Sequence, residues 1–112
     1  MSDRNPDIHP KEAAAQQADV QLLDVREPAE WTAGHIEGAL HVPMHQLNEH
    51  QDELATDRTI VCVCRSGNRS GAVAEALRRA GYDAVNMLGG MQGWAADGLP
   101  FVSEDGQDPR VA

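Results

Sequence analysis

Thr59-Ile60-Val61-Cys62-Val63 runs directly into Cys64-Arg65-Ser66-Gly67-Asn68-Arg69-Ser70 in the middle of this chain. The first five residues are apolar or β-branched, as in a buried strand. From Ala72 to Ala80 the apolar residues recur at steps of three and four, which is the period of a helix, and Gly81 supplies its end. The stretch therefore predicts a strand, a short loop and a helix, with Cys64 at the end of the strand.

A cysteine at such a junction faces main-chain N–H groups and the positive end of a helix dipole, which both favour the thiolate. Gly67 can adopt a positive φ and let the loop curl with its amides inward. Arg65 and Arg69 carry positive charge suited to an oxyanion. The pattern predicts a reactive Cys64 in an anion-binding loop, whose substrate-binding residues we expect to be Arg65, Ser66, Gly67, Asn68, Arg69 and Ser70.

The rest of the chain alternates between short apolar runs and helical patterns. Strands are predicted over residues 20–25, 39–42 and 84–88 as well as 59–63, and helices over 9–17, 27–31, 44–54 and 89–96. This alternation predicts an α/β fold with a mainly parallel sheet of about five strands and helices on both faces. Ligands bind such sheets beyond the carboxyl ends of the strands, where Cys64 lies.

The composition limits the class of protein. With 112 residues, 41% of them hydrophobic, the chain can form one domain with a core; we assign residues 1–102 to it, with the core over about 8–102. The acidic segment 103–112 is expected to be disordered. A formal charge of −9 argues against nucleic acid or a membrane as partner. No apolar leader or membrane span is found, so a cytoplasmic location is expected.

Three blocks of the sequence resemble the single-domain rhodaneses, which are thiosulfate sulfurtransferases. The first block comprises Leu23–Glu27, Glu30-Trp31 and Gly34–Ala39; the second is the loop 64–70; the third comprises Leu88–Trp94 and Gly98–Pro100. The blocks follow one another in the order of the family, and the resemblance extends from about Val20 to Pro100. It implies a rhodanese-like fold.

The resemblance implies a persulfide cycle on Cys64. Its thiolate would take the sulfane sulfur of thiosulfate, and a second nucleophile would collect it: cyanide in an assay, or a thiol such as that of a thioredoxin-like protein. No cofactor is implied. A persulfide carrier or redox-sensing module served by a partner protein is the alternative. Phosphatase or arsenate reductase chemistry is disfavoured, because those relatives have a loop one residue longer than the Cys-x4-Arg spacing of Cys64 and Arg69.

Several further residues receive supporting roles. Asp24 and Arg26 lie at the end of the first predicted strand, and structural roles are expected for both: Arg26 pairs an acid such as Glu30, and Asp24 caps or braces a loop. Direct contact with the substrate is the alternative. His35 is expected to brace a loop by hydrogen bonding. His41, His45 and His50 match no zinc spacing, so no metal site is predicted. Cys62 is interpreted as a core residue, with a resolving disulfide to Cys64 as the open alternative.

Overall fold

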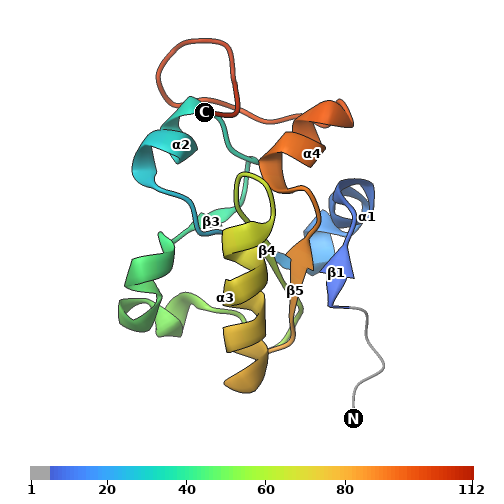
Figure 1. The fold of residues 1–112 in the computed structure, drawn as a ribbon, viewed down its shortest axis with the longest axis vertical. Helices are drawn as coiled ribbons and strands as arrows, with labels where there is room; N and C mark the ends of the chain where they lie inside the picture. The colour runs from blue at the N-terminus through green and yellow to red at the C-terminus, as the bar shows by residue number, and fades with distance from the viewer. Residues whose placement is uncertain (1–5) are drawn as a thin grey trace.

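The computed structural model describes residues 6–112 and contains one parallel five-stranded sheet in the order β1-β5-β4-β2-β3. Its central strand β4 (Ile60–Val63) pairs with β2 (Gln21–Asp24) and β5 (Ala84–Met87). The outer strands are β1 (Asp7–Ile8) beside β5 and β3 (Leu40–His41) beside β2. The expected α/β architecture is confirmed, and the carboxyl end of β4 points into the loop before α3 (Figure 1). The part of the predicted domain over residues 1–5 lies outside the described residues.

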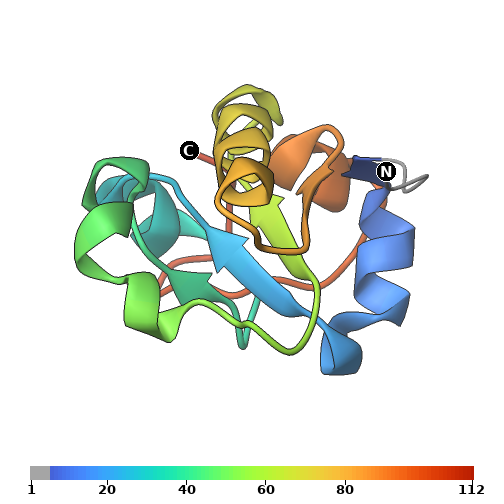
Figure 2. The same cartoon turned by 90° about the horizontal axis from the view of Figure 1, so that it is seen from below.

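Helices cover both faces of the sheet. Every residue of β4 is buried, because alternate side chains enter two separate cores. Ile60 and Cys62 pack with α3 (Asn68–Arg79), whereas Val61 and Val63 pack with α1 (Pro10–Ala15) and α4 (Gly90–Ala96). Figure 2 shows α3 in gold above the strands and the red C-terminal segment below them.

Two short helices begin in the same way. α1 and α2 (Pro28–Ala33) each start at a proline, whose fixed φ suits the first helical turn. In each, a glutamate three residues after the cap accepts the N–H of the cap residue: Glu12 from His9 and Glu30 from Glu27. Within residues 6–112, no helix has the length and apolar character that crossing a bilayer requires.

Residues 44–54 form two 3₁₀ helices, η2 (Met44–Glu49) and η3 (Gln51–Glu53), where one exposed helix was predicted. The prediction of a single helix was wrong, because the segment forms 3₁₀ turns. Met44 and Leu47 are three residues apart, so they share one side of a three-residue turn, and the next apolar residue is Leu54. A third 3₁₀ helix, η1 (Gln17–Asp19), follows α1.

The segment 103–112 has a defined course, in contrast to the predicted disorder. Its N–H groups bind carbonyls of the last turn of α2, which have no partner within that helix: Glu104 donates to Thr32 (2.9 Å) and Arg110 to Ala33 (3.0 Å). Val111 packs on the core beneath the sheet. Composition alone missed this, because the hydrogen bonds that anchor the segment come from its main chain and its packing comes from a single valine.

Candidate active site

Cys64 lies directly after β4, with its sulfur enclosed by the loop that leads into α3. The N–H of Gly67 donates to its Sγ at 3.1 Å, and the Ser70 hydroxyl lies 3.2 Å from it. Gly67 is the N-cap of α3 and has a φ of 102°, a left-handed conformation that glycine adopts without steric cost. Only 1% of Cys64 is exposed, so these donors act on a sulfur that water hardly reaches.

The loop favours the thiolate of Cys64. Burial raises the pKa of the thiol, but hydrogen bonds from the Ser70 hydroxyl and from the N–H groups of Ser70, Gly67 and Ser66 outweigh it. The pKa therefore lies below the ordinary value of a cysteine. The sulfur is also close to the amino end of the twelve-residue helix α3, whose dipole acts in the same direction.

The first turn of α4 sets the direction of the loop's peptide groups. Met91 N–H donates to the carbonyl of Cys64 at 2.8 Å, and Gln92 N–H donates to that of Arg65 at 3.0 Å. These are N–H groups that have no partner within α4 itself. In a trans peptide the N–H points away from the carbonyl. Because the Arg65 carbonyl is held toward α4, the N–H of Ser66 points away from α4 and toward the sulfur. The close approach needs Gly90, where a Cβ would lie 2.4 Å from the Cys64 oxygen.

The two arginines of the loop have different surroundings. Arg69 makes a bidentate pair with Glu30 of α2, with both N···O distances 2.8 Å. Arg65 is exposed, and its Nε donates to the main-chain oxygen of Ala112 at 3.0 Å. The charge of Arg69 is therefore balanced within the fold, whereas that of Arg65 has no carboxylate side chain paired with it among the described residues.

The other predicted loop residues occupy three different settings. Ser66 and Asn68 are exposed, and Asn68 is the first residue of α3, without the left-handed backbone that asparagine tolerates. Gly67 is partly buried, and Ser70 is fully buried. The structure thus places Ser70 and the amide of Gly67 at the sulfur, with the Ser66 and Asn68 side chains toward solvent.

Asp24 and Arg26 form a buried pair at the end of β2. The Arg26 guanidinium donates to both carboxylate oxygens of Asp24 at 2.8–3.1 Å and to the carbonyl of Gly34 at 2.7 Å. Arg26 therefore pairs with an acid, as predicted, but the acid is Asp24 and not Glu30. Glu30 projects from α2 toward α3 and is taken by Arg69, whereas Arg26 turns back onto its own strand.

His35 braces the segment around α2 and does not contact Cys64. Its ring stacks on Trp31 with centroids 3.6 Å apart, its Nδ1 lies 2.9 Å from the Trp31 carbonyl, and its Nε2 lies 3.2 Å from Glu104. His41 stacks on the same indole and contacts the carbonyl of Arg26. Across residues 6–112, no three His, Cys, Asp or Glu side chains gather as metal ligands would.

Asn86 is a site residue that the sequence reading missed. It lies in β5, is 8% exposed, and contacts both Gly67 and Ser70. A signal was present in the sequence: an amide in the apolar run Ala84–Leu88 must find hydrogen-bond partners once buried. The identity of those partners depends on which loop crosses the end of the neighbouring strand, and this follows only from the fold.

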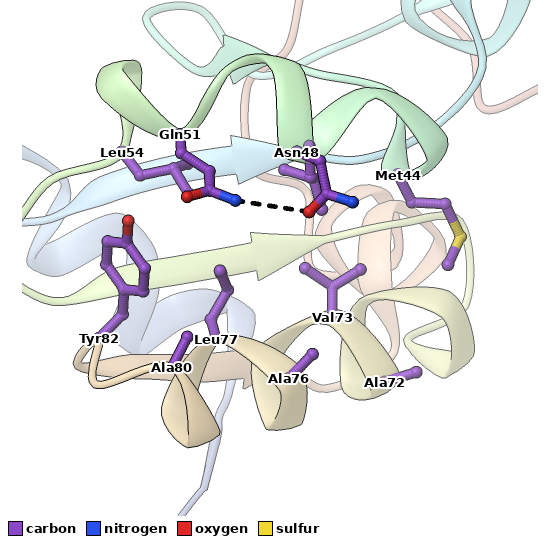
Figure 3. A pocket seen from close by; sticks show the side chains of 11 residues that line it. Met44, Asn48, Gln51, Leu54, Ala72, Val73, Ala76, Leu77, Ala80 and Tyr82 are labelled. Atoms are coloured by element: carbon purple, nitrogen blue, oxygen red, sulfur yellow. Dashed lines mark hydrogen bonds between the residues drawn. The ribbon is translucent and has the colours of Figure 1, made fainter.

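A separate cavity of about 330 Å³ lies between η2, η3 and α3 (Figure 3). Its walls are mostly apolar, including Leu54, Val73 and Leu77, and the Asn48 and Gln51 amides bond to each other beside it. The lining includes neither cysteine, histidine nor a charged side chain. The chemistry of Cys64 therefore takes place outside this cavity.

We predict that the Glu30–Arg69 pair stabilises the fold in a pH-dependent way. The hydrogen bond from Arg69 holds the pKa of Glu30 below its ordinary value, although burial opposes this. A lowered folded-state pKa stabilises the protein above the unfolded pKa, and this contribution is lost as the pH falls through the folded value. Glu30→Gln should lower the free energy of unfolding at pH 7 by about 1 kcal/mol, after allowance for solvent screening of Arg69.

Urea unfolding of both proteins between pH 7 and pH 3 measures this difference, which should shrink toward zero at the acid end. Glu75→Gln is the matched control, because Glu75 pairs with Arg79 on the exposed face of α3. Its effect should be only a few tenths of a kcal/mol. A Glu30→Gln deficit that stays constant down to pH 3 would contradict the prediction.

We also predict that Cys62 does not act as a resolving cysteine. Cys62 is 0% exposed, and β2 and β5 hold its strand on both sides. Burial raises the pKa of its thiol to about 12, so it stays protonated and is a poor nucleophile. Mild peroxide followed by mass spectrometry should give oxidised Cys64 with Cys62 unmodified. Cys64 should be oxidised at the same rate in the parent chain and in Cys62→Ala. Recovery of a Cys62–Cys64 disulfide would refute this.

Comparison with known proteins agrees with this geometry. Residues 9–97 match the family model of the Rhodanese-like domain. The chain is 43% identical to a sulfurtransferase of Allochromatium vinosum, over 82% of this chain and 87% of that protein. It is 34% identical to the thiosulfate sulfurtransferase GlpE of Actinobacillus succinogenes, over 79% and 80% of the two chains.

Among solved structures, it is similar to a rhodanese-related protein from Thermoplasma volcanium, with a TM-score of 0.83 and 33% identity over 88% of this chain and 98% of that one. Two further relatives are longer, and the chain spans 60% and 56% of their lengths. The family match covers most of the chain, including β2, the Cys64 loop and α4. This chain therefore belongs to the rhodanese-like domain family, and the relatives to which it is similar include sulfurtransferases.

Proposed function

We propose that this chain transfers a sulfane sulfur from thiosulfate to a thiophilic acceptor through a persulfide on Cys64. The observation that carries the proposal is the setting of the Cys64 sulfur, which faces the Gly67 amide and the Ser70 hydroxyl at 3.1 and 3.2 Å in a Cys-x4-Arg loop. Sulfurtransferases among the relatives support the reaction type.

The reaction has two displacements. In the first, the Cys64 thiolate attacks the sulfane sulfur of thiosulfate; a bond forms between the two sulfurs while the S–SO₃ bond breaks, and its electron pair leaves with sulfite. In the second, cyanide or an acceptor thiolate attacks the outer sulfur. The persulfide S–S bond then breaks, and its electrons return to Cys64 as the thiolate. The loop amides stabilise negative sulfur at the beginning and the end of this cycle.

Arg65 is the residue that we assign to the anionic donor and to the departing sulfite. It is exposed at the rim of the loop and has no carboxylate side chain as partner in the described part of the chain. Arg69 maintains the shape of the loop through Glu30, although its charge still lies near the thiolate. Asp24, Arg26 and His35 support the surrounding segments and do not bond to the sulfur.

A thiol is the acceptor that we propose in the cell, with a thioredoxin-like protein as one candidate. The second candidate function is a persulfide carrier that a partner protein loads, since the same loop would hold the transferred sulfur. The two functions differ in their donor. An enzyme that uses thiosulfate loads itself, whereas a carrier needs a protein persulfide.

The test is mass spectrometry of the intact chain after exposure to thiosulfate. The proposal predicts a gain of one sulfur atom on Cys64, removal of that sulfur by cyanide or a thiol, and turnover in a thiocyanate assay. A loaded Cys64 with a protein persulfide donor, but none with thiosulfate, would establish the carrier function instead. Steady-state kcat/KM values for the two donors give the same discrimination in quantitative form.

A further inference from the structure

Asn86 connects the middle of the sheet to the reactive loop. It lies on β5 opposite Cys62 of β4, in a strand whose four residues are all buried. Its Nδ2 donates to the carbonyl of Gly67 at 3.1 Å, and its Oδ1 lies 2.6 Å from the Ser70 hydroxyl oxygen. The same hydroxyl is 3.2 Å from the sulfur of Cys64. Asn86 is therefore connected to the Cys64 sulfur by two hydrogen bonds, with Ser70 between them.

The carbonyl of Gly67 fixes the direction of this chain of hydrogen bonds. A carbonyl oxygen can only accept, so the amide NH₂ of Asn86 must face it, and the amide oxygen must face Ser70. Ser70 has a single hydroxyl proton but two acceptors within reach, the Asn86 oxygen and the Cys64 sulfur. It can donate to one of them at a time.

We propose that Asn86 is a positioning residue that competes with the Cys64 thiolate for the Ser70 hydroxyl proton and thereby limits the ionisation of Cys64. In the thiol state, S–H of Cys64 donates to Ser70, and Ser70 donates to Asn86. When the thiol proton leaves to a solvent base, the Ser70 proton turns to the sulfur, and the Asn86 oxygen loses its donor. Ionisation of Cys64 thus requires the loss of a buried hydrogen bond elsewhere.

The charged groups around Cys64 come from the other elements of the site. Arg69 of α3 is paired with Glu30 of α2, and Arg26, which follows β2, is paired with Asp24 of that strand. Arg65 belongs to the loop itself, and Cys62 lies beneath it in β4. None of these groups bonds to Asn86, so they remain in place when Asn86 is replaced.

A double-mutant cycle on Asn86 and Ser70 tests the proposal. We would measure the rate of Cys64 alkylation by iodoacetamide from pH 4 to pH 9, in a Cys62→Ala background that leaves one thiol. Asn86→Leu should raise the alkylation rate on the acidic limb of the pH profile, where Cys64 is mostly protonated, roughly two- to tenfold, because the Ser70 hydroxyl then has only the thiolate as acceptor. Ser70→Ala should lower it. In the Ser70→Ala chain, Asn86→Leu should change nothing, since no shared proton remains.

Two results would overturn the proposal: slower alkylation of Asn86→Leu on the acidic limb, or an equal effect of Asn86→Leu with and without Ser70. Gly67 O keeps the helical bond from Gly71 N–H (3.1 Å) after either replacement, and Asn86→Ala serves as the second variant if the leucine is not accommodated.

The inference rests on the proposed function only in taking Cys64 as the reacting group. Alkylation needs no sulfur donor, so failure of sulfur transfer and failure of this competition are separate results.

Discussion

Replacement of Cys64 by serine should reduce sulfurtransferase turnover by at least about 10³-fold while leaving the fold intact. Serine has nearly the same size as cysteine and can accept the hydrogen bonds that Gly67 and Ser70 direct at this position. Its hydroxyl, however, remains protonated at neutral pH and does not form a persulfide. Thiocyanate production measures the loss, and thermal unfolding verifies that the protein is folded.

Cys62→Ala is the matched control, because it removes the other thiol from the same strand. Cys62 lies wholly within the core and does not enter the proposed cycle, so turnover should stay within about threefold of the parent chain, with a stability loss of about 1 kcal/mol. The opposite pattern, an active Cys64→Ser chain and an inactive Cys62→Ala chain, would place the nucleophile at Cys62 and refute the mechanism.

Local sequence rules were sufficient for the α/β class and for the position of Cys64, although the two-residue edge strand β1 was not among the predicted strands. β4 is recognisable because it is apolar without interruption, as a central parallel strand must be, and α3 because its apolar stripe ends at Gly81. Their junction places Cys64 at the carboxyl edge of the sheet irrespective of the details of the other elements.

Partner choice among polar side chains could not be predicted in the same way. Arg26 is the arginine near Glu30 in the sequence and was therefore its expected partner. Only the relative placement of α2 and α3 brings Arg69 to Glu30 and leaves Arg26 with Asp24. Asn86 likewise acquires its role because β5 lies next to β4. Such pairings depend on distances between elements that are far apart in the sequence, and periodicity contains no information about these distances.

The glycines of the third block illustrate the same limit. In the sequence, Gly89-Gly90 indicates only the entry to a short helix. In the structure, Gly90 has a φ of 56° and lies against the main chain of Cys64 and Arg65. Its importance therefore comes from a contact with a loop about 25 residues earlier in the chain, as well as from its own backbone conformation.

Gly90→Ala should accordingly be among the most damaging single changes outside Cys64. The new Cβ would lie 2.4 Å from the Cys64 oxygen and 2.7 Å from the carbonyl carbon and oxygen of Arg65, none of which is a flexible side chain. Relief of this overlap must move the loop away from α4 and break the hydrogen bonds from Met91 and Gln92. We expect a loss of about 2–4 kcal/mol in the free energy of unfolding and, in the remaining folded protein, a fall in kcat/KM of at least about 10²-fold.

Gly98→Ala separates this overlap from the cost of the backbone conformation alone. Gly98 also has a positive φ (71°), but its Cβ would meet nothing within 4 Å. It should therefore lose only about 1–2 kcal/mol and keep its turnover. Urea unfolding together with thiocyanate kinetics compares the two variants. Equal stability losses with full activity in Gly90→Ala would show that the contact between α4 and the loop does not hold the amides toward the sulfur, whereas a selective loss in Gly90→Ala ties the activation of Cys64 to that contact.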